Sequence, residues 1–236
     1  MGKFINHQFK NLITRFFIVA SVFFCGFLIW LVQFNLDLSR HKSFRIRLVE
    51  ELMYFPSGKF LKPVVIEYQT AVADLVWLRA IQYYGEHLMS DHKYEYLDHI
   101  FDILSYLDPR FSGAHHFGAL ILAWDARQVQ EALKLIHRGI EYNPLDWQLV
   151  FDAAFINYML TKDYLTAGYY FEIASKLPET WRITERWAAF SFEKGGNIDL
   201  ALEIWLQIFN NTENRKLKEL AERNIAKLLQ QKATKD

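Results

Sequence analysis

The sequence is poor in cysteine, proline and glycine, and it carries no net charge. Its 236 residues include one cysteine, five prolines and ten glycines. A single cysteine excludes a disulfide framework and a zinc site built from cysteines. So little proline and glycine argues against all-β and collagen-like chains. Lys plus Arg number 27, as do Asp plus Glu, so the basic excess typical of nucleic-acid binding is absent.

Apolar and aromatic residues are abundant instead. They make up 52% and 17% of the chain, respectively. This is ample material for a packed core, and it excludes disorder as the main state. With few turn-forming residues available, the composition predicts an all-α protein with long helices.

The amino-terminal segment predicts a membrane anchor. Residues 1–15 form a short basic tail, and residues 16–36 form an uncharged, strongly apolar run. A run of about 20 such residues has the length needed to cross a bilayer. A cleaved signal peptide is the main alternative, but it needs a shorter apolar region and a small-x-small cleavage site. The sequence at Phe34-Asn35-Leu36-Asp37 offers no such site.

The orientation of this anchor does not follow from the flanking charges alone. Basic residues lie on both sides of residues 16–36, and they are Lys3, Lys10, Arg15, Arg40, Lys42, Arg45 and Arg47. Translocating a short basic tail is costly, whereas a large following domain can be translocated regardless of its charge. We therefore expect a single-pass protein of a bacterial inner membrane with its carboxy-terminal domain in the periplasm. The opposite sidedness remains the alternative.

The rest of the chain divides into a connector, a repeat region and a cap. Residues 37–69 are charged and contain a turn signal at Phe55-Pro56-Ser57-Gly58. Helical periodicity then runs through residues 70–210, and residues 211–236 form an amphipathic capping helix and tail. The expected helices of the repeat region span 70–89, 93–107, 111–124, 129–142, 147–160, 164–176, 180–193 and 198–209.

Three sets of small or apolar residues recur at intervals of 35, 35 and 34 residues. The first set is Leu97, Ala132, Ala167 and Ala201, the second is Phe101, Ile136, Phe171 and Trp205, and the third is Leu104, Gly139, Ala174 and Ile208. A fixed period of this length is typical of a solenoid of helix pairs. The small residue lets two helices approach closely, and the bulky residue one turn later fills the space between pairs.

These units resemble tetratricopeptide repeats, whose period is 34 residues. The residues that carry the resemblance are the segment from Glu131 to Asn143-Pro144, then Asp108-Pro109, Tyr158, Lys162-Asp163-Tyr164, Ala167, Phe171, Ala174, Gly196-Asn197 and Ala201. Lys162 replaces the usual glycine, Pro178 comes one residue early, and the first helices lack the Trp-x-x-Leu-Gly signature. The resemblance implies an all-α fold in which one transmembrane helix precedes an α-solenoid of about four helix pairs and a capping helix.

No pattern of catalytic or metal-binding residues is present. His115 and His116 are adjacent and point to different sides of a helix, so they do not readily bind one ion. The sequence contains no His-Glu-x-x-His motif, phosphate-binding glycine loop or Gly-x-Ser-x-Gly elbow. We expect no enzyme activity, catalytic residue, cofactor or metal.

The resemblance implies instead a concave face, lined mainly by the first helix of each pair, that binds other proteins or peptide segments. Carried over to this chain, its partner-binding positions are Gln82, Glu86, Phe117, Ile121, Trp124, Leu149, Asp152, Ile156, Met159, Arg186 and Phe190. Trp124 and Arg186 are the strongest candidates, because aromatic and arginine side chains dominate binding hot spots. The competing interpretation is that several of these residues belong to the core.

The sequence therefore predicts a membrane-anchored protein-interaction scaffold or assembly factor that contacts lipid through residues 16–36 and does not bind nucleic acid. Two alternatives remain open. One is a chaperone-like factor for secreted or membrane clients, and the other is a membrane adaptor that faces the cytosol. The sequence does not identify the partner, the oligomeric state or the envelope pathway.

Overall fold

The computed structural model describes residues 24, 26–34 and 56–234, and the chain divides into two units, Met1–Phe55 and Pro56–Asp236. In the first unit, residues 26–34 are helical, and the Trp30 ring stacks 5.5 Å from Phe34. Most of the predicted anchor, residues 16–36, lies outside the described residues. Among those that are described, no helix has the length and apolar character needed to span a bilayer.

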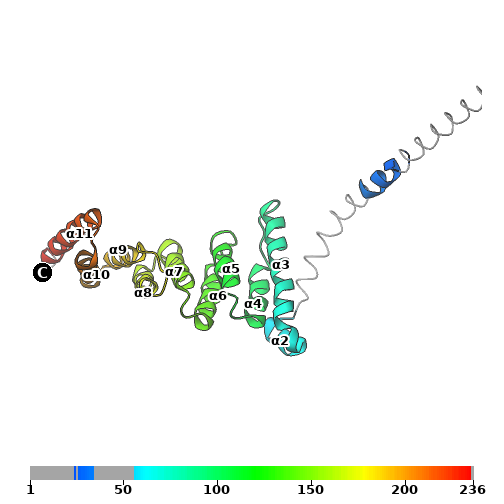
Figure 1. Cartoon of the computed structure of the whole chain (residues 1–236), viewed down its shortest axis with the longest axis horizontal. Helices are drawn as coiled ribbons and strands as arrows, with labels where there is room; N and C mark the ends of the chain where they lie inside the picture. Colours follow the sequence, from blue (N-terminus) through cyan, green and yellow to red (C-terminus); the bar gives the residue numbers. More distant parts are fainter. Residues whose placement is uncertain (1–23, 25, 35–55, 235–236) are drawn as a thin grey trace, which may run out of the picture. The chain divides into compact units, whose positions relative to one another are not determined.

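The second unit is all-helical, as predicted, and residues 56–234 contain no strand (Figure 1). Its elements are α2 (Gly58–Val65), the short helix η1 (Ile66–Tyr68), α3 (Gln69–Leu88), α4 (Leu97–Leu107), α5 (Ser112–Trp124), α6 (Val129–Tyr142), α7 (Trp147–Ile156), the π-helix η2 (Asn157–Thr161), α8 (Tyr164–Ser175), α9 (Thr184–Lys194), α10 (Ile198–Asn211) and α11 (Arg215–Ala233).

The helices from α3 to α10 pack as four successive pairs. α3 packs on α4, α5 on α6, α7 on α8 and α9 on α10, while α11 packs on α10. The second helix of each pair also contacts the first helix of the next pair. In addition, α5 contacts α7 and α4 contacts α6, so equivalent helices of neighbouring pairs meet. This is the packing of a helical-repeat stack, and it is compatible with an α-solenoid.

The predicted 35-residue period is confirmed by burial. All twelve positions of the three sets lie in the second helices α4, α6, α8 and α10, and all twelve are buried. Ala132, Ala167 and Ala201 are completely inaccessible to solvent, as are the bulky Phe171 and Trp205 one turn later. The sequence pattern therefore marks the residues that form the interior of each pair.

Two glycines permit the closest helix contacts. A Cβ atom at Gly139 of α6 would lie 2.8 Å from the Cβ of His115 in α5. One at Gly118 of α5 would lie 2.6 Å from a ring carbon of Phe101 in α4. Both distances are shorter than van der Waals contact. The helices can therefore approach this closely only because neither position carries a side chain.

The turn inside each pair repeats as well. His92, Arg127, Lys162 and Gly196 have φ values of 55°, 57°, 62° and 85°, and each lies between the two helices of a pair. These positions follow the same 35-, 35- and 34-residue spacing as the buried sets. A left-handed backbone costs a non-glycine residue about 1–2 kcal/mol. The turn geometry is therefore retained even where lysine, arginine or histidine replaces glycine.

Side-chain caps define the start of several helices. Asp146, Asp163 and Asn197 accept hydrogen bonds from backbone N–H groups in the first turns of α7, α8 and α10. Asn214 does the same for two N–H groups of α11. Such caps satisfy donors that have no partner within the helix. They explain why the predicted starts of α7, α8 and α10, at residues 147, 164 and 198, agree with the observed ones.

Two helices begin later than predicted. α4 starts at Leu97 rather than at residue 93, because the preceding segment folds against α3, where Tyr83 donates a hydrogen bond to the Lys93 carbonyl. α9 starts at Thr184 rather than at residue 180. The early Pro178 and the left-handed backbone of Glu179, with φ of 58°, form an irregular turn there.

The predicted connector, residues 37–69, contains helix α2 and the short helix η1. α2 is only eight residues long and contains Pro63. It packs on α4, and its buried Gly58 lies against Ile103 and Tyr106. Local sequence signals did not predict this helix, because its position depends on contacts with residues more than 40 positions away.

Candidate protein-binding surface

Four aromatic side chains, Trp124, Phe155, Tyr158 and Trp187, form a continuous row across three first helices. Trp124 at the end of α5 stacks on Phe155 of α7, with ring centroids 5.5 Å apart. Trp187 of α9 contacts Phe155 and Tyr158 edge-on, at 6.3 Å and 5.4 Å. We call these four residues the aromatic row.

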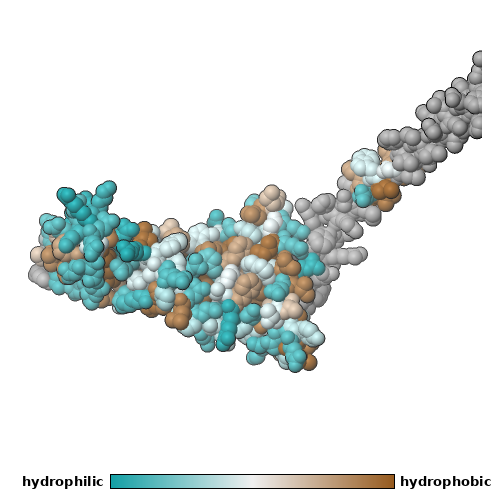
Figure 2. Space-filling model, in the orientation of Figure 1, coloured by the Kyte–Doolittle hydropathy of each residue, from teal (hydrophilic) through white to brown (hydrophobic). Residues whose placement is uncertain are grey.

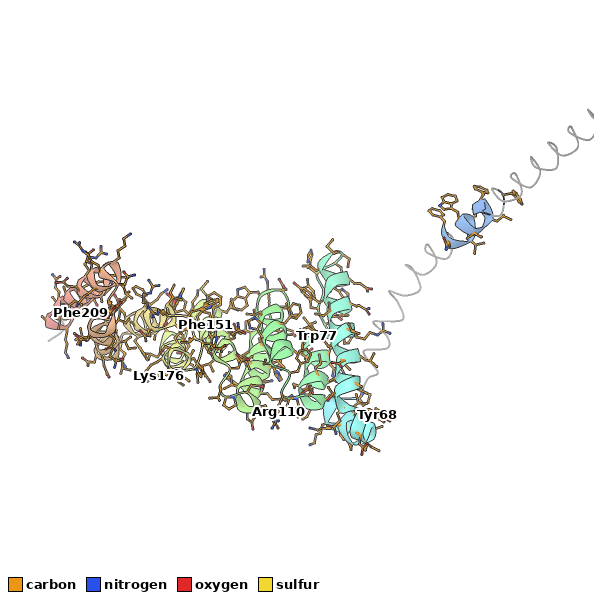
Figure 3. The ribbon with its side chains drawn as sticks, in the orientation of Figure 1. Tyr68, Trp77, Arg110, Phe151, Lys176 and Phe209 are labelled. Atoms are coloured by element: carbon orange, nitrogen blue, oxygen red, sulfur yellow. The ribbon has the colours of Figure 1, made fainter. Side chains whose placement is uncertain are left out.

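The aromatic row is only partly covered. All four of its side chains are of intermediate exposure. Two further apolar side chains near it in sequence, Met159 and Phe190, are 39% and 38% exposed. Equivalent aromatic contacts at the start of the stack are made by Trp77 of α3, labelled in Figure 3, which packs edge-on against Phe117. Partly exposed aromatic residues on neighbouring helices are typical of surfaces that bind other proteins.

A cavity of about 580 Å³ adjoins the aromatic row. Tyr158 and Trp187 belong to both the row and the cavity wall. The other walls come from α9 and α11, and they include Arg186, Phe190, Glu193, Lys194, Lys227 and Gln231. The volume lies within the range of about 300–1,000 Å³ that is usual for ligand sites. In Figure 2 the carboxy-terminal end of the unit is mainly hydrophilic, as expected of a capping helix.

The cavity wall is rich in cations. Lys227 pairs with Glu193 at 2.5 Å, which joins α11 to α9. Lys194 lies over the rings of Tyr158 and Tyr164, at 4.9 Å and 4.5 Å from their centroids. A hydrogen bond with Tyr164 raises the pKa of Lys194, so this ammonium group is protonated at neutral pH. The cavity therefore carries more positive than negative charge.

A partly buried acid–base pair joins α5 to α7. His116 Nδ1 makes a short hydrogen bond to the Asp152 carboxylate. The Asp152 side chain is 7% exposed, and that of His116 is 40% exposed. The hydrogen bond to Asp152 raises the pKa of His116. Burial raises the pKa of the Asp152 carboxyl, and the hydrogen bond from His116 opposes this effect.

We expect His116→Ala to lower the free energy of unfolding by about 1–2 kcal/mol at pH 7, because it leaves the buried Asp152 carboxylate without its partner. The loss is expected to be smaller at pH 9. The hydrogen bond to Asp152 raises the pKa of His116 above its ordinary value of about 6.5, so the stabilising contribution of His116 is complete below that value and is lost as the pH rises through the raised pKa. Urea unfolding followed by circular dichroism at both pH values measures this difference.

Asp152→Asn is the matched control, because it removes the titrating carboxyl and keeps its shape. In this background, His116→Ala should cost less than in the wild-type protein. The loss should no longer be larger at pH 7 than at pH 9, because the charge that raises the pKa of His116 is gone. An equal loss for His116→Ala at both pH values would contradict the assignment of this pair.

Three predicted binding residues lie in the core instead. Ile121 is 6% exposed, and Leu149 and Ile156 are inaccessible to solvent. Asp152 is also buried, and its carboxylate is hydrogen-bonded to His116. These side chains cannot form the outer surface of a binding groove. A shift of one residue rotates a side chain by about 100° around a helix, so a small error in register exchanges core and surface positions.

Other predicted residues are distributed along the stack. Trp124 belongs to the aromatic row, Arg186 and Phe190 line the cavity, and Met159 is exposed on η2. Three more lie on α3 and α5: Gln82 is exposed, while Glu86 and Phe117 are partly buried. Gln82 accepts a hydrogen bond from Arg79 of its own helix. The structure therefore brings Arg186 and Phe190 together at the cavity and places Trp124 in the aromatic row, whereas Gln82 and Glu86 lie in the first helix pair.

The prediction missed Phe155, Tyr158, Trp187, Lys194 and Lys227. A sequence signal existed for the first three, because Phe155 and Tyr158 have i, i+3 spacing, as do Trp187 and Phe190. Lys194 follows Trp187 by seven residues and continues the same helix face. Nothing in the local sequence indicates that Lys227 of α11 lines the same cavity, because its position depends on how α11 packs against the rest of the stack.

The described residues contain no group of three or more His, Cys, Asp or Glu side chains arranged to hold a metal ion. The expectation that the protein binds no metal or cofactor stays a prediction.

No protein-family model matches the chain. No curated protein matches it either.

Proposed function

We propose that this chain is a membrane-anchored, tetratricopeptide-like scaffold or assembly factor that binds partner polypeptides. The observation that carries the proposal is the aromatic row of Trp124, Phe155, Tyr158 and Trp187, which crosses three helix pairs and opens into the cavity beside α11. A surface that extends over several repeats suits an extended or helical peptide better than a compact small molecule.

The tetratricopeptide-like character is supported by two independent repeats of the same spacing. One is the burial of small and bulky side chains in the second helices, such as Ala132 and Ile136. The other is the left-handed turn within each pair. A helix pair with a small residue at its closest contact and a fixed tight turn is the repeating unit that the family would require.

The membrane anchor is supported by the sequence of residues 16–36. A further argument comes from the start of the second unit, where large apolar side chains are unusually exposed. Phe60, Val64, Ile66 and Tyr68 are between 68% and 74% exposed. These residues belong to α2 and η1, the first described elements after the proposed anchor. Apolar side chains beside lysines such as Lys59 are suited to the boundary between headgroups and acyl chains.

We place the repeat domain on the outer, periplasmic side of a bacterial inner membrane. The basic tail of residues 1–15 would then stay on the cytoplasmic side. The proposed protein holds its partner at the membrane surface, and it supplies a binding surface without a chemical step of its own.

We expect Trp124→Ala to reduce partner capture by about tenfold or more while leaving the fold intact. Trp124 is partly exposed and stacks on Phe155, so truncation removes contact area from the surface rather than from the core. A membrane-impermeant, lysine-reactive cross-linker is added to sealed right-side-out membrane vesicles that contain the full-length protein. The yield of cross-linked product is compared between the wild-type and variant proteins.

Trp181→Ala is the matched control, since Trp181 is 58% exposed and lies outside the aromatic row. It should leave the yield unchanged. A single product in stoichiometric amount supports a scaffold, whereas many weak products favour a chaperone-like factor. Product that forms only after lysis indicates a cytosol-facing adaptor. A large drop in melting temperature for Trp124→Ala would place this residue in the core and contradict the proposed surface.

A further inference from the structure

The wall of the cavity beside α11 carries more positive than negative charge. Three cationic side chains, Arg186, Lys194 and Lys227, line it together with one carboxylate, that of Glu193. Lys227 pairs with Glu193, so the positive charges of Arg186 and Lys194 have no carboxylate counterpart in the wall. The cavity is therefore suited to an anionic group.

Arg186 is the most specific of these cations. Its Nε is buried and has no hydrogen-bond partner within residues 56–234. Buried polar groups in proteins nearly always have a partner, and an unpaired donor costs free energy. A guanidinium group can bind a carboxylate through two parallel N–H···O hydrogen bonds. Arg186 lines the cavity wall, so a carboxylate in the cavity can bind its guanidinium group.

The remaining walls of the cavity are apolar and aromatic. Tyr158, Trp187 and Phe190 lie beside the cations, and Phe190 is held edge-on against the buried Trp205 at 5.1 Å. A ligand that fills the cavity must therefore present an apolar group next to its negative charge. A free inorganic anion would leave this aromatic surface uncovered.

The cavity is continuous with the aromatic row, because Tyr158 and Trp187 belong to both. A polypeptide lying along the row would reach the cavity without a break. This continuity favours a segment of a protein chain over a detached lipid or small molecule, which would use the cavity alone.

We propose that the cavity binds an acidic segment of the partner polypeptide, with a Glu or Asp carboxylate on Arg186 and an adjacent leucine or aromatic side chain against Trp187 and Phe190. Lys194 adds long-range attraction from the rim. This inference rests on the proposed function, which it deepens by naming the chemistry of the partner at one end of the surface.

The test uses full-length protein in detergent and two fluorescein-labelled short peptides. In one, glutamate alternates with leucine and tryptophan, and in its twin glutamine replaces each glutamate. Fluorescence anisotropy should show that the glutamate peptide binds at least about tenfold more tightly than the glutamine peptide. The preference should weaken as salt is raised, because part of it is attraction between screened charges. Arg186→Gln should abolish it.

Arg182→Gln is the matched control, because Arg182 is exposed just before α9 and does not line the cavity. It should keep the preference for glutamate. Lys194→Gln provides a second variant at an exposed position, where folding is not at risk, and it should weaken the preference by about threefold, consistent with an exposed charge pair.

Equal affinity for the two peptides, or no binding of either, would overturn the acidic-segment proposal. So would binding of vesicles that contain anionic lipid in an Arg186-dependent manner while the peptides do not bind, because the ligand would then be a lipid headgroup. If the peptides fail but Trp124-dependent cross-linking persists, only this inference is lost. If both fail, the proposed function is lost with it.

Discussion

Ala167→Trp is expected to lower the free energy of unfolding by about 1–3 kcal/mol or more. Ala167 is inaccessible to solvent in α8 and belongs to a core cluster with Ala154 of α7 and Ala188 of α9. The neighbouring Gly168 is already so close to α9 that a Cβ there would lie 2.8 Å from the Phe192 ring. An indole cannot enter this space without separating α7, α8 and α9, and overpacking of this kind is destabilising.

Urea unfolding monitored by circular dichroism measures the effect, and Ala132→Trp in α6 should behave alike because Ala132 occupies the same repeat position. Ala226→Trp is the control, since Ala226 lies on the exposed face of α11 and should change stability by less than about 0.5 kcal/mol. If both buried variants kept the wild-type melting temperature, the assignment of the small repeat position would be wrong.

Trp205→Ala is expected to have an even larger effect, a loss of about 3–5 kcal/mol. Trp205 of α10 is inaccessible to solvent and belongs to the core cluster that includes Phe192 of α9 and Leu228 of α11. Its removal leaves a cavity where α9, α10 and α11 meet. Because Phe190 packs on the Trp205 ring, the wall of the cationic cavity should also loosen.

The control is Leu206→Ala, because Leu206 follows Trp205 in the same helix. Leu206 is 41% exposed, so its truncation should cost less than about 1 kcal/mol. Urea unfolding gives both values, and amide hydrogen exchange tests whether α11 loses protection first in Trp205→Ala. A loss below about 1 kcal/mol for Trp205→Ala would contradict its place at the centre of this cluster.

Much of the fold was predictable because its signals are local and repeated. The predicted helix over residues 129–142 agrees with α6, which runs from Val129 to Tyr142. α2 was not predicted, because an eight-residue helix with an internal proline has weak local signals and depends on packing against α4. The same holds for the start of α9, which is displaced by the turn at Glu179.

The candidate surface was less predictable than the fold. Trp124, Arg186 and Phe190 were identified by residue type and by their place on the first helices. Leu149 and Ile156 were assigned to the surface although they are buried, because apolar residues occur on both sides of α7. Periodicity identifies an apolar stripe, but it does not state which part of a wide stripe faces the neighbouring helix.

Sequence alone determined the helical class, the four-unit period and the small residues at the helix contacts, because each depends on residues within one turn or one repeat. Only the tertiary structure decided which side chains of α5, α7, η2 and α9 form the aromatic row. It also decided that Lys227 of α11 meets Glu193 and that His116 meets Asp152. These contacts join residues more than 30 positions apart, and they depend on how far each helix pair is rotated against the next.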